Sequence, residues 1–238
     1  ALAWILIGLM VRTRIRSKEA LQRATGQTLL AVLPRLQNPR RFKTKLLSID
    51  RHQDLAALEV LRQLAINLER KDTKTLMITS AVPDVGKSFI AANLAALVAD
   101  TGKRVLLVDA DQKRGKLGTR LTKGRLKPGE PKPSSTERLW VVSGAAPDQL
   151  GQWKQDYDLV VIDTPPLLVL AEAGRWAREV DGSIMVAWSG KSAADEIQEA
   201  QHRLELAGGR QVDWILNAVS PKSVGYHAYR KYGFGSTY

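Results

Sequence analysis

The triplet Gly86-Lys87-Ser88 stands between a short apolar run and a longer segment with helical character. The eight residues from Ala81 to Ser88 match the phosphate-binding loop (P-loop) pattern, except that alanine replaces its first glycine. In such a loop, backbone N–H groups at the start of a helix surround a phosphate group. The segment therefore predicts a nucleotide phosphate site, with Lys87 on the terminal phosphates and the Ser88 hydroxyl on Mg²⁺. The predicted phosphate-binding residues are Asp84, Val85, Gly86, Lys87, Ser88 and Phe89.

Two further apolar runs end in aspartate. Asp109 and Asp111 follow the run 105–108, and Asp163 follows the run 159–162. In an open α/β sheet, ligands bind beyond the carboxyl ends of the strands, so we expect these carboxylates beside the P-loop. A carboxylate there can hold Mg²⁺ directly or through water. One such aspartate alone could merely cap a helix, but the coincidence of all three features favours an ATP·Mg²⁺ site. The candidate catalytic residues are Lys87, Asp109, Asp111 and Asp163, and the candidate metal ligands are Ser88, Asp111 and Asp163.

Apolar runs alternate with helical patterns along most of the chain. The expected strands are 75–79, 104–111, 138–144, 158–163, 183–188 and 212–219, and the expected helices are 52–70, 89–102, 171–180 and 194–209. Strands that are apolar throughout predict a mostly parallel sheet with helices on both faces, which is an α/β fold. Upstream, Ser17 and Gly26 are typical caps for a short helix, and residues 28–34 have the composition of a strand.

Composition excludes several classes of function. The chain has 238 residues, of which 44% are apolar, so it can bury a core. It has no cysteine, which excludes disulfides and thiolate zinc sites. Three histidines also argue against a histidine-based metal site. Its net charge of +12 is unevenly distributed: residues 12–51 carry +9, residues 112–138 carry +7 and residues 222–238 carry +3. The remainder of 52–221 carries −7. Because the basic residues lie outside the expected folded body, no nucleic-acid partner is expected.

The N-terminus begins with eleven apolar residues, and Arg12, Arg14, Arg16 and Lys18 follow them. A membrane-spanning helix needs about 20 apolar residues, but cations behind an apolar run match the positive-inside rule. We therefore expect residues 1–16 to be the cytoplasmic end of a transmembrane helix, with a short buried strand or helix as the alternative. Residues 17–51 would be a basic juxtamembrane linker beside anionic lipid headgroups. Residues 52–223 would form the P-loop domain, and residues 224–238 a flexible tyrosine-rich tail.

The order of these motifs resembles the bacterial tyrosine kinases, which are the cytoplasmic domains of Wzc-type polysaccharide co-polymerases. The resemblance spans nearly the whole chain. The stretch 105–115 (VLLVDADQKRG) looks like the second Walker motif of that family, and the stretch 156–168 (DYDLVVIDTPPLL) looks like its Walker B motif. The C-terminal tyrosines resemble the autophosphorylation cluster of the family. They are Tyr226, Tyr229, Tyr232 and Tyr238, four of the five tyrosines in the chain.

The resemblance implies a P-loop NTPase fold of the MinD/ParA type and an ATP·Mg²⁺-dependent tyrosine autokinase at the cytoplasmic face of the inner membrane. Such a kinase regulates the chain length, polymerisation and export of exopolysaccharide, and its partners are the export machinery, a tyrosine phosphatase and further copies of itself. A tail tyrosine would enter the site of a neighbouring subunit. Asp109 or Asp111 would orient or deprotonate the phenol, and the other would hold Mg²⁺ with Asp163. Asn217 would contact the adenine, although a role in a turn is equally open.

The chain also departs from the family pattern. Glu59 and Arg62 match two positions of an assembly helix whose third position is here Ala65, and Lys113 replaces an arginine after the second Walker motif. The segment from Asp111 to Asp163 is short, and residues 144–153 (GAAPDQLGQW) replace a helix expected there. A degenerate kinase that serves as a nucleotide-sensing or assembly module is therefore an alternative. A ParA/MinD-like ATPase is a second alternative, although Val82 and Pro83 stand where those proteins carry an extra lysine.

Overall fold

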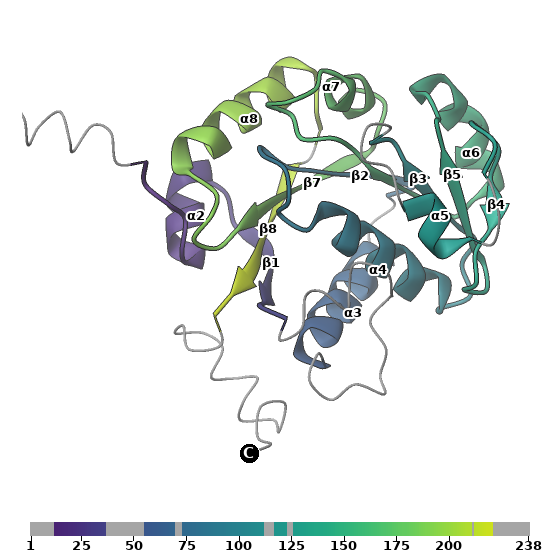
Figure 1. The fold of residues 1–238 in the computed structure, drawn as a ribbon, viewed down its shortest axis with the longest axis horizontal. Coiled ribbons are helices and arrows are strands. Elements are labelled where there is room, and N and C mark those ends of the chain that lie inside the picture. The colour runs from purple at the N-terminus through teal and green to yellow at the C-terminus, as the bar shows by residue number, and fades with distance from the viewer. Residues whose placement is uncertain are drawn as a thin grey trace, which may run out of the picture.

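The computed structural model describes residues 12–36, 55–69, 73–111, 117–122, 126–210 and 212–220. Within these ranges, eight strands form one sheet in the order β1-β8-β7-β2-β6-β3-β5-β4 (Figure 1). All neighbouring strands are parallel except the β4–β5 pair, so the predicted mostly parallel sheet is confirmed. The strands are β1 (Leu29–Pro34), β2 (Thr75–Thr79), β3 (Val105–Asp109), β4 (Lys132–Pro133), β5 (Leu139–Ser143), β6 (Leu159–Asp163), β7 (Gly182–Trp188) and β8 (Val212–Val219).

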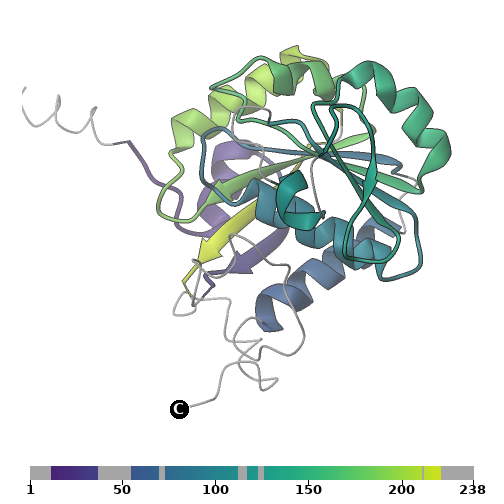
Figure 2. The ribbon, with the colours of Figure 1, turned by 45° about the vertical axis from the view of Figure 1, so that its right-hand side comes forward.

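Helices cover both faces of this sheet, as Figures 1 and 2 show from two directions. The helices α3 (Leu55–Glu69), α4 (Lys87–Ala99) and α5 (Leu117–Leu121) pack on one face. The helices α2 (Lys18–Thr25), α6 (Leu150–Asp156), α7 (Glu172–Ala177) and α8 (Ala194–Leu206) pack on the other. Every residue of β2, β3 and β6 is buried, because successive side chains enter opposite cores. This explains why the central strands are apolar throughout.

The folded structure begins well before residue 52, which is the predicted start of the P-loop domain. Helix α2 has the predicted caps, since the Ser17 hydroxyl accepts a hydrogen bond from the Ala20 N–H and Gly26 adopts the left-handed conformation. Strand β1 pairs in parallel with β8 and so forms an edge of the sheet. Leu21 and Leu33 are fully buried. Part of the expected linker therefore belongs to the core.

Residues 12–16 are extended and not helical. Arg14 forms an antiparallel bridge with Ala193, and Ile15 is 1% exposed in the core. Residues 1–11, where we predicted most of the membrane-helix remnant, lie outside the described residues. In the part of the chain that is described, no helix combines the length and the apolarity needed to cross a bilayer.

The segment 144–153 contains helical structure that its sequence pattern does not predict. A 3₁₀ turn (Pro147–Gln149) leads directly into α6. The helix forms because Leu150 and Trp153 are buried beneath the sheet, although polar residues surround them in the sequence. Tertiary packing therefore decides this element, and not local pattern.

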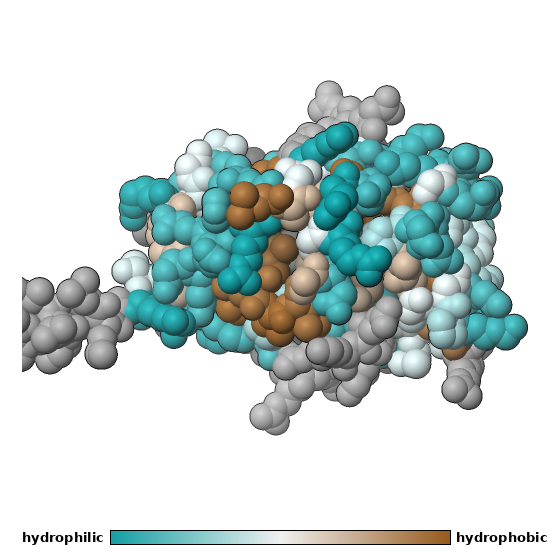
Figure 3. Space-filling model, turned by 90° about the horizontal axis from the view of Figure 1, so that it is seen from above, coloured by the Kyte–Doolittle hydropathy of each residue, from teal (hydrophilic) through white to brown (hydrophobic). Residues whose placement is uncertain are grey.

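The face that carries α7 and α8 is mostly hydrophilic, and hydrophobic residues gather in several neighbouring areas near its middle (Figure 3). At the end of α8, Leu206 is 75% exposed, whereas Ile197 and Leu204 of the same helix are buried. Single exposed apolar residues of this kind are normal on soluble proteins.

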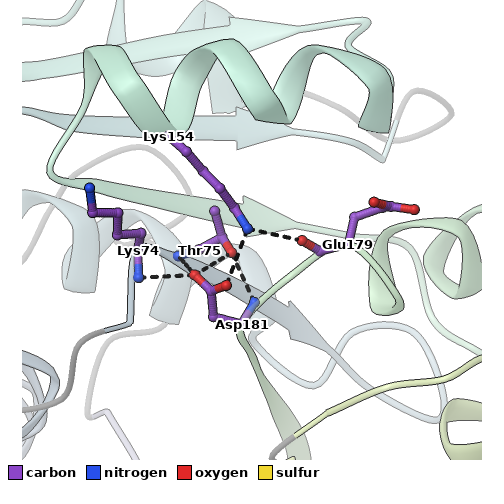
Figure 4. Close-up of polar contacts among 5 residues, drawn as sticks. All are labelled: Lys74, Thr75, Lys154, Glu179 and Asp181. Atoms are coloured by element: carbon purple, nitrogen blue, oxygen red, sulfur yellow. Dashed lines mark hydrogen bonds and ion pairs between the residues drawn. The ribbon is translucent and has the colours of Figure 1, made fainter.

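A polar cluster joins three elements at the amino edge of the sheet, where β2 begins (Figure 4). The P-loop follows the other end of β2. The Oδ2 atom of Asp181 accepts hydrogen bonds from the backbone N–H and the hydroxyl of Thr75, at 2.9 and 2.8 Å, and from the Lys74 N–H at 3.1 Å. Its Oδ1 atom pairs with the Lys154 ammonium at 3.1 Å, and that ammonium also reaches the Glu179 carbonyl oxygen. Asp181 thus connects the start of β2, the entry to β7 and helix α6.

Candidate nucleotide site

The loop between β2 and α4 has the backbone conformation of a phosphate-binding loop. Asp84 and Gly86 adopt left-handed conformations, with φ of 59° and 89°, and α4 begins at Lys87. A Cβ atom at position 86 would lie 2.3 Å from the Asn217 Nδ2 atom, so only glycine fits there. Ala81 has no positive φ and is buried, which explains why alanine can replace the first glycine of the pattern.

Side chains from distant parts of the sequence hold the carbonyl groups of this loop. The Asn217 amide, on β8, donates to the Val85 carbonyl oxygen at 2.9 Å. The Lys191 ammonium, in the connection from β7 to α8, donates to the carbonyl oxygens of Pro83 at 3.2 Å and Asp84 at 3.1 Å. Sequence reasoning missed Lys191, since no motif contains it. The Asn217 Oδ1 atom accepts from the Ala218 N–H, and its predicted contact with adenine stays a prediction.

Two buried carboxylates lie beside the loop, at the ends of neighbouring strands. Asp109 of β3 is the direct partner of Asp163 of β6, and the two side chains are 2% and 1% exposed. The Asp109 Oδ2 atom accepts a hydrogen bond from the Leu117 N–H at 3.1 Å. Within the described part of the chain, the Oδ1 atoms of both aspartates are buried without a hydrogen-bond partner. The topology thus brings together the two aspartate strands that the motifs predicted to meet.

The environment of Asp163 connects it to the P-loop. Burial raises the pKa of Asp163 to about 7, while the Lys87 charge and a hydrogen bond from the Ser88 hydroxyl act to lower it. The negative charges of Asp109 and Asp111 raise it further. Burial also raises the pKa of Asp109 to about 6, against hydrogen bonds from the backbone N–H groups of α5. The ammonium, the hydroxyl and the carboxylates therefore share one site.

This donor set fits Mg²⁺. The Asp163 carboxylate, whose buried Oδ1 atom has no hydrogen-bond partner among the described residues, and the Ser88 hydroxyl are hard oxygen donors, which Mg²⁺ prefers. The described residues contain no group of three acidic, histidine or cysteine side chains arranged to hold a metal ion by themselves. Mg²⁺ commonly takes one or two carboxylates and completes its shell with water and phosphate oxygens, so a sparse donor set is sufficient.

Of the other predicted functional residues, some lie near the P-loop and others lie outside the described residues. Val85 is buried, Phe89 lies half-buried in the first turn of α4, and Asp111 follows β3. Lys113 and the candidate phosphoacceptors Tyr226, Tyr229, Tyr232 and Tyr238 lie outside the described residues. On α3, Arg62 and Glu59 form an exposed ion pair at 4.0 Å, whereas Ala65 faces the core.

Comparison with known proteins identifies the family. Residues 76–224 match the CobQ/CobB/MinD/ParA nucleotide binding domain. The chain belongs to this family. Within the CobQ/CobB/MinD/ParA family, its fold is that of a MinD/ParA-like P-loop NTPase, as predicted.

Among the relatives are the tyrosine-protein kinase Etk of Escherichia coli K12, which is 32% identical over 81% of this chain, and the tyrosine-protein kinase Wzc of Salmonella typhimurium, which is 30% identical over 82%. The chain spans 31% of the length of each. The solved kinase domain of Escherichia coli Etk is similar with a TM-score of 0.72 and 25% identity, over 92% of this chain and 97% of that one. The resemblance to bacterial tyrosine kinase domains that the motifs predicted is thus confirmed.

Proposed function

We propose that this chain is an ATP·Mg²⁺-dependent protein-tyrosine autokinase domain, held at the cytoplasmic face of the inner membrane by a membrane-anchored parent protein. One observation carries the proposal: Lys87 and Ser88 of the P-loop act on the buried Asp163, which in turn faces Asp109. A phosphate-binding loop, a cation and paired carboxylates are the parts that phosphoryl transfer from a nucleotide requires. The similarity to proteins named as tyrosine kinases selects this reaction among those of P-loop proteins.

Each residue then has a definite role. The backbone of residues 84–89 would bind the phosphates, and Lys87 would neutralise charge that develops on the transferred group. Ser88, Asp111 and Asp163 would hold Mg²⁺, which supplies further charge neutralisation when it is bound. Asn217 would contact the adenine.

The acceptor would be a tyrosine of the C-terminal tail. Its phenol oxygen forms a bond to the γ-phosphorus while the bond to the bridging oxygen of ADP breaks. Asp109 would accept the phenol proton, for which its pKa of about 6 is suitable near neutral pH. Asp111 is the alternative acceptor.

The similarity to Wzc-type kinases supports a wider role. We propose that the domain regulates exopolysaccharide chain length, polymerisation and export, and that transfer occurs between copies in a homo-oligomer. The export machinery and a tyrosine phosphatase would be its partners. Phosphates on the tail would add negative charge and weaken contacts with acidic surfaces of a neighbouring copy.

The test is incubation of the purified chain with ATP and Mg²⁺, followed by mass spectrometry, with Lys87→Met as the matched control. The expected result is phosphate on Tyr226, Tyr229, Tyr232 or Tyr238 that is absent from the control. If the protein binds nucleotide but stays unmodified, the hypothesis of a degenerate sensing or assembly module would replace the kinase hypothesis. ATP hydrolysis without tyrosine phosphate would favour the ParA/MinD-like ATPase.

A further inference from the structure

We propose that Lys191 is a positioning residue of the P-loop, which fixes the peptide units that bind the nucleotide phosphates. The proposal rests on the nucleotide-binding part of the proposed function. It concerns a residue that lies outside every motif in the chain and more than 100 positions from the loop it contacts.

The contact determines which way the loop's donors point. The Lys191 ammonium binds the carbonyl oxygens of Pro83 and Asp84. In a planar trans peptide unit, the C=O and N–H groups point in opposite directions. When the carbonyls of Pro83 and Asp84 are held on the Lys191 side, the N–H groups of Asp84 and Val85 must face the other side of the loop. Lys191 therefore orients two successive donors at once.

Asn217 holds the next carbonyl group along the loop in the same way. Its amide holds the Val85 carbonyl oxygen at 2.9 Å, and this orients the N–H of Gly86. Three consecutive carbonyls, from residues 83 to 85, are thus fixed by side chains from outside the loop. Their three partner N–H groups, of residues 84 to 86, immediately precede α4, and the start of a helix is where a phosphate would bind.

The loop needs this support because its backbone is unusual. Asp84 adopts a φ of 59°, a left-handed conformation that is uncommon for a residue other than glycine. Such conformations persist where surrounding contacts hold them in place. A lysine ammonium has three donors, so one side chain can hold both carbonyls that flank this position.

Lys191 can hold the loop because its own backbone is fixed by the N-terminal segment 12–16. The Arg14 guanidinium donates to the Lys191 carbonyl oxygen. On either side of Lys191, the Gly190 N–H donates to the Ile15 carbonyl at 2.6 Å, and the Ile15 N–H donates to the Ser192 carbonyl at 2.9 Å. The lysine thus projects from an anchored segment toward the P-loop.

The experiment measures the dissociation constant of ADP with Mg²⁺, by the fluorescence of a labelled analogue, for four proteins: wild type, Lys191→Met, Lys191→Arg and Lys103→Met. Lys103 precedes β3 at the opposite edge of the sheet, so its variant controls for the loss of one charge. We expect Lys191→Met to weaken binding about 10-fold, equivalent to about 1.4 kcal/mol. Lys191→Arg should recover most of this loss, and Lys103→Met should match wild type.

A second measurement separates positioning from general stability. Without nucleotide, Lys191→Met should unfold at the wild-type temperature, whereas saturating ADP with Mg²⁺ should protect the amides of residues 84–86 from hydrogen exchange less in Lys191→Met than in wild type. Equal ADP affinity of Lys191→Met and wild type would overturn the inference and leave the proposed function standing. Wild type that binds no nucleotide would overturn both.

Discussion

Asp109 and Asp163 lie directly opposite each other on adjacent parallel strands, and both are buried, each with one carboxylate oxygen that no described residue hydrogen-bonds. Two carboxylates in such an arrangement are costly to ionise, because burial and mutual repulsion both oppose the charged form. The fold accepts this cost at the position where the proposed reaction needs negative charge. Residues of this kind commonly lower stability and serve function.

The first prediction concerns Asp163→Asn in the absence of nucleotide and metal. Its folded pKa, at about 7, lies above its ordinary value of 3.8, so the folded protein binds a proton that the unfolded chain releases. The stability associated with this group is therefore full below about pH 4 and is lost as the pH rises through about 7. Asn cannot ionise, so the variant should be more stable than wild type at pH 8, by at most about 4 kcal/mol, and similar to it at pH 4.

Thermal unfolding of both proteins in EDTA at several pH values measures this difference. Asp156→Asn, an exposed carboxylate on α6, is the control and should show no comparable gain at pH 8. A melting-temperature difference between Asp163→Asn and wild type that does not change from pH 4 to pH 8 would contradict the interpretation.

The second prediction is that Gly86→Ala abolishes nucleotide binding. The new Cβ would collide with the Asn217 amide, and alanine is strained at a φ of 89°. We expect destabilisation of about 1–3 kcal/mol and a P-loop displaced from β8. Gly151→Ala is the matched control, since a Cβ there meets no atom within 4 Å and the residue lies within α6. It should bind nucleotide normally and be as stable as wild type or more so. Titration calorimetry with ADP checks the binding result.

The third prediction concerns the amino edge of the sheet. Asp181→Ala removes the acceptor for two backbone N–H groups and the Thr75 hydroxyl (Figure 4). Loss of these bonds should cost about 1–3 kcal/mol in the free energy of unfolding, measured by urea denaturation. Lys154→Met breaks the partly exposed ion pair and the longer contact with the Glu179 carbonyl oxygen, and it should cost less than about 1 kcal/mol. Nucleotide affinity should be unchanged in both, because the cluster lies at the edge opposite the P-loop. Equal stability losses in the two variants would refute this account.

The fourth prediction tests where the folded domain begins. Ile15→Ala should destabilise the protein by about 2–4 kcal/mol, because Ile15 is buried in the core shared with α8 and β8. The neighbouring Thr13→Ala removes an exposed side chain and should cost little. If Ile15→Ala unfolds at the same urea concentration as wild type, residues 12–16 are not part of the cooperative unit.

The parts of the site that could be predicted from the sequence are those encoded locally. Gly86-Lys87-Ser88 and the strand-end aspartates were visible because a parallel sheet always places strand ends on one edge. Lys191 was invisible, since its contact depends on how the β7–α8 connection lies over a loop 107 residues away. Helix α6 was missed for a related reason: the burial of Trp153 stabilises it, and its polar neighbours conceal the pattern. The charge pattern predicts that Arg14 and Ile15 lie near a membrane, because it does not reveal their strand-like contact with the remote β7–α8 connection.

Asn217 contacts the P-loop and lies only nine residues before Tyr226, one of the proposed acceptors. The length of the intervening chain therefore limits the distance between this tyrosine and the P-loop. Strand β8 ends at Val219, two residues beyond Asn217, and the chain continues from there. A residue advances the chain by at most about 3.6 Å, so Tyr226 lies within about 32 Å of Asn217 whatever path the chain takes. If Tyr226 is the acceptor, as proposed, each molecule carries it at a local concentration that dilution does not change. Transfer within one chain would keep its rate per molecule at every dilution, whereas the proposed transfer between copies would slow once dilution dissociates the oligomer.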